Sequence, residues 1–141
     1  MLFRSLIVAG DNLFTESLKG FVACAKGTEA TVGVYDVGDP EAIKKYGNVL
    51  INDEEIITHL EEKPQKPRGT LAAIALYYYS PGVLSLLTTY LAAGNNPDQP
   101  GRFVQWLYTR QPVKTFQIKG KWLDIGSKET LENADQILRK I

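Results

Sequence analysis

Apolar and polar residues follow one another along this chain in blocks that predict both strands and helices. Short apolar or β-branched runs that end in a turn residue are typical of buried strands. They cover residues 2–9, 30–37, 71–79 and 113–118, and a shorter extended piece covers residues 122–124. Residues 48–52 and 55–63 flank Asp53 and Glu54, which favours a hairpin.

Helical spacing of apolar residues marks the segments between these runs. It predicts helices over residues 15–25, 80–94 and 103–107, and Asp39-Pro40-Glu41 indicates a short helix that begins there. Ser127 is a capping residue for a last helix, which we expect to bury Leu131, Ala134, Ile137, Leu138 and Ile141. Strands and helices therefore alternate, which predicts one three-layer α/β domain over residues 1–141 with a mostly parallel sheet.

Composition narrows the classes of function. Acidic and basic residues balance at 16 each, so no positive field exists to drive binding to nucleic acid. The single cysteine excludes an internal disulfide, and His59, the single histidine, disfavours nucleophilic hydrolase chemistry. No apolar run reaches the roughly 20 residues that a membrane span needs. We expect a cytoplasmic protein that binds neither nucleic acid nor a membrane.

Two aspartates follow predicted strands. Asp11 comes directly after the first strand, and Asp124 ends the last extended piece. Because ligands of such sheets bind beyond the carboxyl ends of the strands, these carboxylates could converge on a hard cation such as Mg2+. Each also has a structural interpretation, because Asp11 suits an Asx turn and Asp124 suits a helix cap.

Glu62-Lys63-Pro64 ends another predicted strand. A carboxylate can accept hydrogen bonds from two sugar hydroxyls, and an ammonium suits a phosphate. Neighbours on a strand face opposite sides, so only a local bend would let Glu62 and Lys63 reach one ligand. The alternative is a solvated run of charges that includes Glu61.

Five motifs in order resemble the sugar-1-phosphate nucleotidyltransferase family, above all its glucose-1-phosphate thymidylyltransferases and the related uridylyl and mannose-1-phosphate guanylyl enzymes. The motifs are Gly10-Asp11-Asn12, Tyr46-Gly47, Glu62-Lys63-Pro64, Leu76-Tyr77-Tyr78-Tyr79 and Trp122-Leu123-Asp124-Ile125-Gly126-Ser127. Residues 94–107 also resemble a subset of this family. The resemblance spans the whole chain and implies a Rossmann-like fold.

The resemblance also implies a reaction. In the family, an oxygen of a sugar 1-phosphate attacks the α-phosphorus of a nucleoside triphosphate, which gives a nucleotide sugar and pyrophosphate. Asp11 and Asp124 match the two metal-binding aspartates, which makes Mg2+ the expected cofactor and these two residues the expected catalytic ones. In-line transfer of this kind depends on positioning and charge neutralisation.

The expected substrate contacts come from the same resemblance. Glu62 matches the residue that binds sugar hydroxyls, and Lys63 matches the residue that contacts the sugar phosphate. Tyr77 matches a position that lines the sugar pocket, and Asn12 belongs to the motif of the first aspartate. Ala75 departs from the family, because many members carry glycine there against the sugar.

A larger departure concerns the nucleotide. The family's glycine-rich loop with an arginine and a lysine has no counterpart before Gly10. The chain therefore resembles the C-terminal portion of a family member, without the N-terminal nucleotide-binding part. We expect the isolated chain to be inactive. We also expect it either to form a homo-oligomer or to pair with the missing N-terminal part.

Three interpretations remain open at this point. The chain is an enzyme or part of one, it is a truncated non-catalytic module that acts in interaction or regulation, or it is an unrelated α/β domain that binds a small molecule. Asp11 and Asp124 favour the first interpretation, and the absent loop favours the second. The third requires Asp11 and Asp124 to lie far apart.

Overall fold

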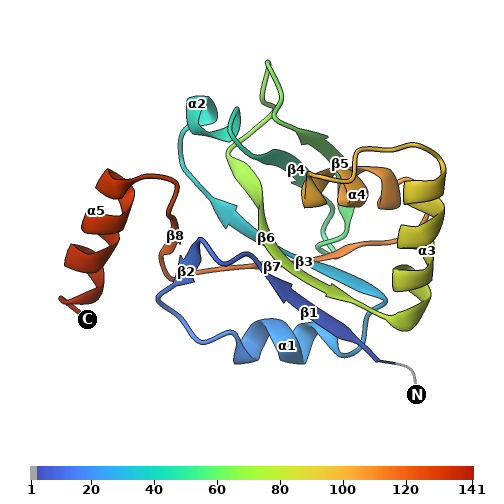
Figure 1. Ribbon diagram of the computed structural model, residues 1–141, viewed down its shortest axis with the longest axis horizontal. Helices are drawn as coiled ribbons and strands as arrows, with labels where there is room; N and C mark the ends of the chain where they lie inside the picture. The colour runs from blue at the N-terminus through green and yellow to red at the C-terminus, as the bar shows by residue number, and fades with distance from the viewer. Residues whose placement is uncertain (1–2) are drawn as a thin grey trace.

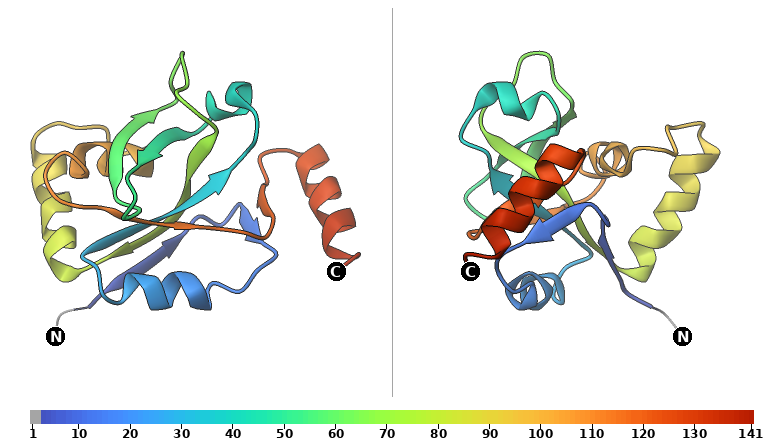
Figure 2. Two further views of the ribbon diagram at one scale, coloured as in Figure 1. Left: turned by 180° about the vertical axis from the view of Figure 1, so that it is seen from behind. Right: turned by 60° about the vertical axis from the view of Figure 1, so that its left-hand side comes forward.

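A computed structural model describes residues 3–141, and residue 2, where the first predicted strand began, lies outside it. A mixed sheet runs through the centre of the molecule, with helices packed on both of its faces (Figures 1 and 2). Eight strands are present in the described part: β1 (Ser5–Val8), β2 (Asn12–Phe14), β3 (Ala30–Asp36), β4 (Gly47–Ile51), β5 (Ile57–Glu62), β6 (Leu71–Tyr79), β7 (Lys114–Gln117) and β8 (Trp122–Asp124).

Five helices connect or follow these strands in residues 3–141: α1 (Lys19–Ala25), α2 (Pro40–Ile43), α3 (Pro81–Ala92), α4 (Pro100–Leu107) and α5 (Lys128–Leu138). Three of these helices have a side-chain cap. The side chains of Asp39, Ser80 and Ser127 accept hydrogen bonds from backbone N–H groups in the first turns of α2, α3 and α5. The hairpin predicted around Asp53 is also confirmed, as β4 and β5.

The expectation of a mostly parallel sheet is wrong. The order is β5-β4-β6-β3-β7, with β1 also paired to β6, and β3–β7 is the parallel pair among five ladders. The long apolar strand β6 is central, as its sequence indicated, but β1, β3 and β4 all run antiparallel to it. An alternation of helices and strands implies parallel pairing only when successive strands are neighbours in the sheet. Here β1 and β3 lie on opposite edges of β6.

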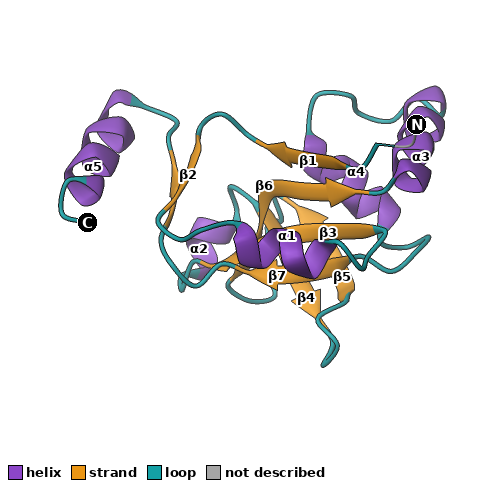
Figure 3. Ribbon diagram, turned by 90° about the horizontal axis from the view of Figure 1, so that it is seen from below, coloured by secondary structure: helices purple, strands orange, loops and turns teal. Residues whose placement is uncertain are grey.

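Each face of the sheet has its own hydrophobic core. Successive residues of β6 alternate between the two, as the pleat of a strand requires. Tyr77 and Tyr79 pack with α3 and α4 on one face, whereas Leu76 and Tyr78 pack with α1 on the other. Figure 3 shows α1 lying along the sheet on the side away from α3 and α4. The layers are therefore those expected, although the strand directions are not.

Two apolar segments are more exposed than their sequences indicated. In β1, the neighbours Leu6, Ile7 and Val8 keep 41–47% of their surface exposed, although this run predicted a buried strand. In α5, Ala134 is buried, but Leu131 and Leu138 are 53% and 39% exposed, and Ile141, beyond the end of the helix, is 79% exposed. Figure 1 shows α5 projecting from the body of the molecule beyond β8. Amphipathic spacing identifies an apolar face, but it does not provide a partner for that face.

A two-stranded sheet joins the beginning and the end of the chain. Strand β2 pairs antiparallel with β8, and Asn12 lies opposite Asp124. Residues 12–14, assigned to no element in the sequence, form β2, and the first helix begins at Lys19 instead of residue 15. This small sheet brings the two predicted metal ligands to the same place. Within residues 3–141, no helix combines the length and the apolar character needed to cross a bilayer.

Candidate functional site

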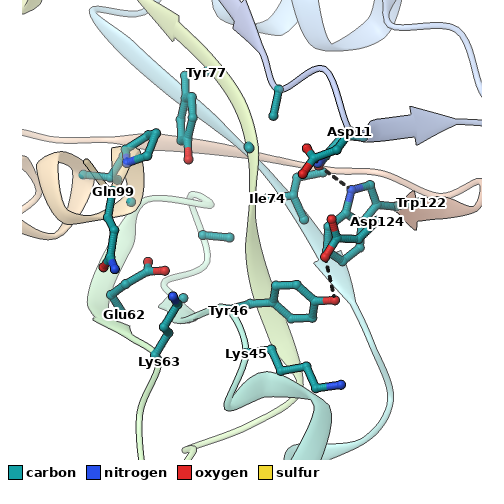
Figure 4. Close-up of a pocket in the computed structure, with 18 of the residues that line it drawn as sticks. Asp11, Lys45, Tyr46, Glu62, Lys63, Ile74, Tyr77, Gln99, Trp122 and Asp124 are labelled. Carbon is teal, nitrogen blue, oxygen red and sulfur yellow. Dashed lines mark hydrogen bonds between the residues drawn. The ribbon is translucent and has the colours of Figure 1, made fainter. Parts of the chain in front are cut away.

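One pocket collects the residues that the sequence singled out. It has a volume of about 350 Å3 and lies between the turn after β1, the β4–β5 hairpin, the middle of β6, the start of α4, and β8 (Figure 4). Asp11, Asn12, Glu62, Lys63, Tyr77 and Asp124 all line it. Positions that are up to 113 residues apart in the sequence therefore share one cavity.

The acidic end of the pocket is built by the β2–β8 pair. The backbone N–H of Ile125 donates to the carbonyl of Asp11 at 2.8 Å, and this bond extends the ladder by one residue beyond Asn12 and Asp124. Figure 4 shows the carboxylates of Asp11 and Asp124 on the same side of the pocket. The hydroxyl of Tyr46 donates to Oδ2 of Asp124 at 3.2 Å. Burial and the Asp124 charge raise the pKa of Tyr46 to about 12, so it remains a donor at neutral pH.

Asn12 links this acidic pair to an aromatic residue. Its Nδ2 donates to Oδ1 of Asp11 at 2.8 Å, and its Oδ1 accepts from Nε1 of Trp122 at 2.7 Å. Because the indole nitrogen is only a donor, this bond fixes the orientation of the Asn12 amide. Trp122 in turn packs edge-on against Tyr46, with the ring centroids 5.0 Å apart. Asn12 therefore orients the carboxylate of Asp11, and Trp122 packs against Tyr46, which donates to Asp124.

A bend at the end of β5 turns Glu62 and Lys63 into the same pocket. Glu62 is the last residue of the strand, and Lys63 has a φ of 49°, in the left-handed region. The Lys63 N–H donates to the carbonyl of Tyr46 at 2.8 Å, which stabilises the bend. This is the deviation from strand geometry that two adjacent residues need in order to reach one ligand.

Glu62 is held tightly at the other end of the pocket from the aspartates (Figure 4). Its backbone N–H donates to Oε1 of Gln105, on α4, at 2.9 Å. A Cβ added at Gly47 would lie 3.0 Å from its Oε2, and one added at Gly101 would collide with the carboxylate. Burial raises the pKa of the Glu62 carboxyl, and the nearby charges of Arg102 and Lys63 oppose this shift.

Tyr77 forms the wall of the pocket above Glu62. Its ring stacks on Tyr79 with the centroids 5.9 Å apart, and its hydroxyl points into the cavity (Figure 4). Burial, and then the charge of Glu62, raise the pKa of the Tyr77 hydroxyl, so that it is neutral and able to donate. Ala75, the position where many members of the resembled family carry glycine, also lines the pocket.

The donor set at the acidic end suits a cation that keeps part of its water shell. No three histidine, cysteine, aspartate or glutamate residues within 3–141 gather into a metal-binding cluster. The pocket lining carries four carboxylates against two ammonium groups, which leaves it negative: Asp11, Glu62, Asp98 and Asp124 against Lys45 and Lys63. Two converging aspartates fit Mg2+, which takes one or two protein carboxylates and completes its shell with water and phosphate.

Several lining residues were not identified as functional from the sequence. Tyr46 and Trp122 occurred in the family motifs but were given no role. Their contacts with Asp124 and Asn12 depend on the pairing of distant segments, which local sequence patterns do not contain. Gln99 and Gly101 lie in a segment that was noted for its resemblance to a subset of the family but was given no role. Both line the pocket, and Gly101 lies against the Glu62 carboxylate.

Comparison with known proteins identifies the family of this chain. A family model described as nucleotidyl transferase matches residues 3–140. The chain belongs to the nucleotidyl transferase family. A glucose-1-phosphate thymidylyltransferase from Neisseria meningitidis is 30% identical over 147 residues, covering 96% of this chain and 48% of the relative. A glucose-1-phosphate adenylyltransferase from Thermomicrobium roseum is 28% identical, covering 94% of this chain and 32% of the relative.

Solved structures show the same fold. A Bacillus anthracis protein described as a glucose-1-phosphate thymidylyltransferase, solved with sucrose, matches with a TM-score of 0.83 and 24% identity, over 98% of this chain and 55% of that one. A UDP-glucose pyrophosphorylase solved with UDP-glucose matches with a TM-score of 0.79 and 24% identity, over 98% and 57%. This member of the nucleotidyl transferase family thus spans between a third and a little over half of these proteins.

Proposed function

We propose that the chain supplies the sugar-phosphate and metal half of a sugar-1-phosphate nucleotidyltransferase, and that it corresponds to the C-terminal portion of the family's catalytic domain. The observation that carries this proposal is that Asp11 and Asp124 share one pocket with Glu62 and Lys63. In the reaction, an oxygen of the sugar phosphate forms a bond to the α-phosphorus of a nucleoside triphosphate. The bond from that phosphorus to the bridging oxygen breaks, and pyrophosphate leaves.

The roles of the residues follow from their places in the pocket. Asp11 and Asp124 would hold Mg2+, which supplies neutralisation of phosphate charge when bound. Lys63 contributes a positive charge for the phosphate of the sugar substrate, and Glu62 accepts hydrogen bonds from sugar hydroxyls. The Tyr77 ring limits the pocket above the sugar. Asn12 retains one N–H on its amide with which to contact substrate.

A nucleotide-binding portion must be added to this half for turnover. The 141 residues contain no glycine-rich run with arginine before Gly10. Strand β1 lies beside the pocket, exposes Leu6, Ile7 and Val8, and pairs with β6 on one edge. Such a strand is suited to receive another strand and an apolar cover. The N-terminal part of the family fold would supply the nucleotide-binding portion, and either this part or a second copy of the chain would cover β1.

Binding of a sugar phosphate to the chain itself tests the proposal. We expect calorimetric titration of glucose 1-phosphate in the presence of MgCl2 to show saturable binding that Glu62→Gln and Asp124→Asn each weaken. The exposed Asp53→Asn serves as the control and should bind as the unaltered chain does. Absence of binding by the unaltered chain would contradict the proposal.

The requirement for a nucleotide-binding portion has its own test. We expect the chain alone, incubated with glucose 1-phosphate, MgCl2 and each nucleoside triphosphate, to release no pyrophosphate. Turnover should appear when the N-terminal portion of a family member is added. A nucleotide sugar formed by the chain alone would refute this part of the proposal. Binding of sugar phosphate without turnover in any mixture would favour a non-catalytic module that senses the ligand.

A further inference from the structure

The start of α4 forms a wall of the pocket beside Glu62. Gln99, Pro100 and Gly101 line the same cavity as the predicted substrate contacts. Gln99 occupies the N-cap position of α4, but its side chain makes no capping hydrogen bond. The backbone N–H groups of Asp98 and Gln99 both donate to Oδ1 of Asn96, at 2.8 and 3.2 Å, which fixes the turn before the helix. The Gln99 side chain is therefore not needed to cap the helix, and another contact sets its orientation.

Arg102 sets the direction of the Gln99 amide. Its Nε donates to Oε1 of Gln99 at 3.1 Å. Because a guanidinium has only donors, the amide oxygen must face Arg102, and the amide NH2 must face the other way. Gln99 and Glu62 line the same pocket, and Figure 4 shows both on the side of it away from the aspartates. No hydrogen bond from this NH2 to another group is found in the described part of the chain.

The position of Glu62 relative to Gln99 is also fixed. Gln105, six residues further along and on α4, accepts the N–H of Glu62 at 2.9 Å. The carboxylate fills the space that a side chain at Gly101 would need. The end of β5 and the start of α4 therefore pack closely against each other. As a result, an acceptor and an oriented donor line the same pocket.

We propose that Gln99 is a specificity-determining residue whose amide NH2 donates to a sugar hydroxyl adjacent to those bound by Glu62. This inference rests on the proposed function, because it concerns how the same pocket chooses its sugar. The Glu62 carboxylate as acceptor and the Gln99 amide as donor would together recognise two neighbouring hydroxyls of the sugar. Inverting one of these hydroxyls moves it away from both groups and leaves a polar group without its partner, which is the strongest basis for discrimination between similar substrates.

Titration with a panel of epimers tests this role. Glucose 1-phosphate, galactose 1-phosphate, mannose 1-phosphate and inorganic phosphate are each titrated into the unaltered chain and into Gln99→Met, with MgCl2 present. Methionine keeps the length of the side chain and removes the donor. We expect the preferred sugar phosphate to bind about tenfold more weakly, as the loss of one hydrogen bond implies, and the preference over its epimers to shrink. The affinity for inorganic phosphate should not change.

Gln111→Met, at a position that does not line this pocket, is the matched control, and thermal unfolding of each variant verifies its fold. If Gln99→Met retains both the affinity and the epimer preference of the unaltered chain, the role of Gln99 is refuted while the proposed function stands. A loss of affinity for inorganic phosphate equal to that for the sugar phosphates would also refute it. If the unaltered chain binds inorganic phosphate but no sugar phosphate, both proposals fail.

Discussion

At the scale of single residues, Glu62 shows that function and stability make opposite demands. Its carboxylate is partly buried, and burial raises its pKa. The ionised form, which we propose accepts sugar hydroxyls, is therefore the form that the folded state disfavours. The bend at Lys63 adds a backbone conformation that side chains rarely adopt. Such local costs are typical of binding sites, where the surrounding structure holds residues in place.

The variant Glu62→Gln tests this conflict. A raised folded-state pKa means that the folded chain binds protons more readily than the unfolded chain, so ionisation of Glu62 costs stability as pH rises through that pKa. We therefore expect Glu62→Gln to have a higher Tm than the unaltered chain at pH 7. The difference should shrink as pH falls below the ordinary glutamate pKa, where both side chains are neutral.

Thermal unfolding between pH 3.5 and 8 provides the measurement, with Glu61→Gln, an exposed neighbour, as the control. Equal Tm differences for the two variants at every pH would contradict the account. The same Glu62→Gln protein should bind glucose 1-phosphate more weakly. A higher Tm together with a lower affinity would show that the carboxylate costs stability but contributes to binding.

Tyr46 makes a second residue-scale prediction, because its hydroxyl donates to Asp124. Loss of a group that hydrogen-bonds to a metal ligand typically lowers metal affinity 10–100-fold. We expect Tyr46→Phe to weaken Mg2+ binding by at least about tenfold, measured by calorimetry, with the fold intact.

Tyr35→Phe is the control for Tyr46→Phe. Tyr35 also packs on Trp122, with the ring centroids 5.7 Å apart, but its hydroxyl is not bonded to Asp124. If the two phenylalanine variants bound Mg2+ equally well, the hydrogen bond from Tyr46 would have no part in orienting Asp124.

At the scale of elements, the sequence predicted the positions of the strands and helices better than their partners. The run at 71–79 matches β6 residue for residue, because a long apolar segment ended by Ser80-Pro81 has few alternatives. Strand directions depend on contacts between distant segments, which local patterns do not contain. The bend at Lys63 was likewise recognised as a requirement, but whether it existed depended on a bond to Tyr46.

Strands β3 and β6 cross closely at Gly33, and this contact gives an element-scale prediction. A Cβ there would lie 3.0 Å from both Cβ and Cδ2 of Leu76, next to the irregular register between Val32 and Val34. We expect Gly33→Ala to lower the free energy of unfolding by about 1–3 kcal/mol, because a packed strand pair cannot move apart locally. Urea denaturation provides the measurement.

Gly27→Ala is the matched control for Gly33→Ala. A Cβ at Gly27 meets no heavy atom within 4 Å, and Gly27 is not among the glycines with positive φ. It should leave stability unchanged or raise it slightly. An equal loss of stability in both variants would mean that the general cost of replacing glycine, and not the β3–β6 contact, decides the result.

At the scale of the whole molecule, the pocket depends on bringing the two ends of the chain together. The motifs indicated which side chains belong to the site, and the pairing of β2 with β8 explains how Asp11 and Asp124 meet. The chain leaves the apolar residues of β1 exposed and spans only part of the length of the related proteins. What one sequence could not reveal is the wall at Gln99, since it depends on how α4 packs against the end of β5.

The most direct test of the account is whether Asp11 and Asp124 bind one cation. Mn2+, which can replace Mg2+ and broadens nearby NMR signals, is titrated into the isotope-labelled chain and into Asp11→Asn and Asp124→Asn. We predict that low Mn2+ broadens the signals around residues 11 and 124 together, and that either substitution abolishes both effects. Broadening around only one of the two positions, or broadening that survives either substitution, would contradict a shared site.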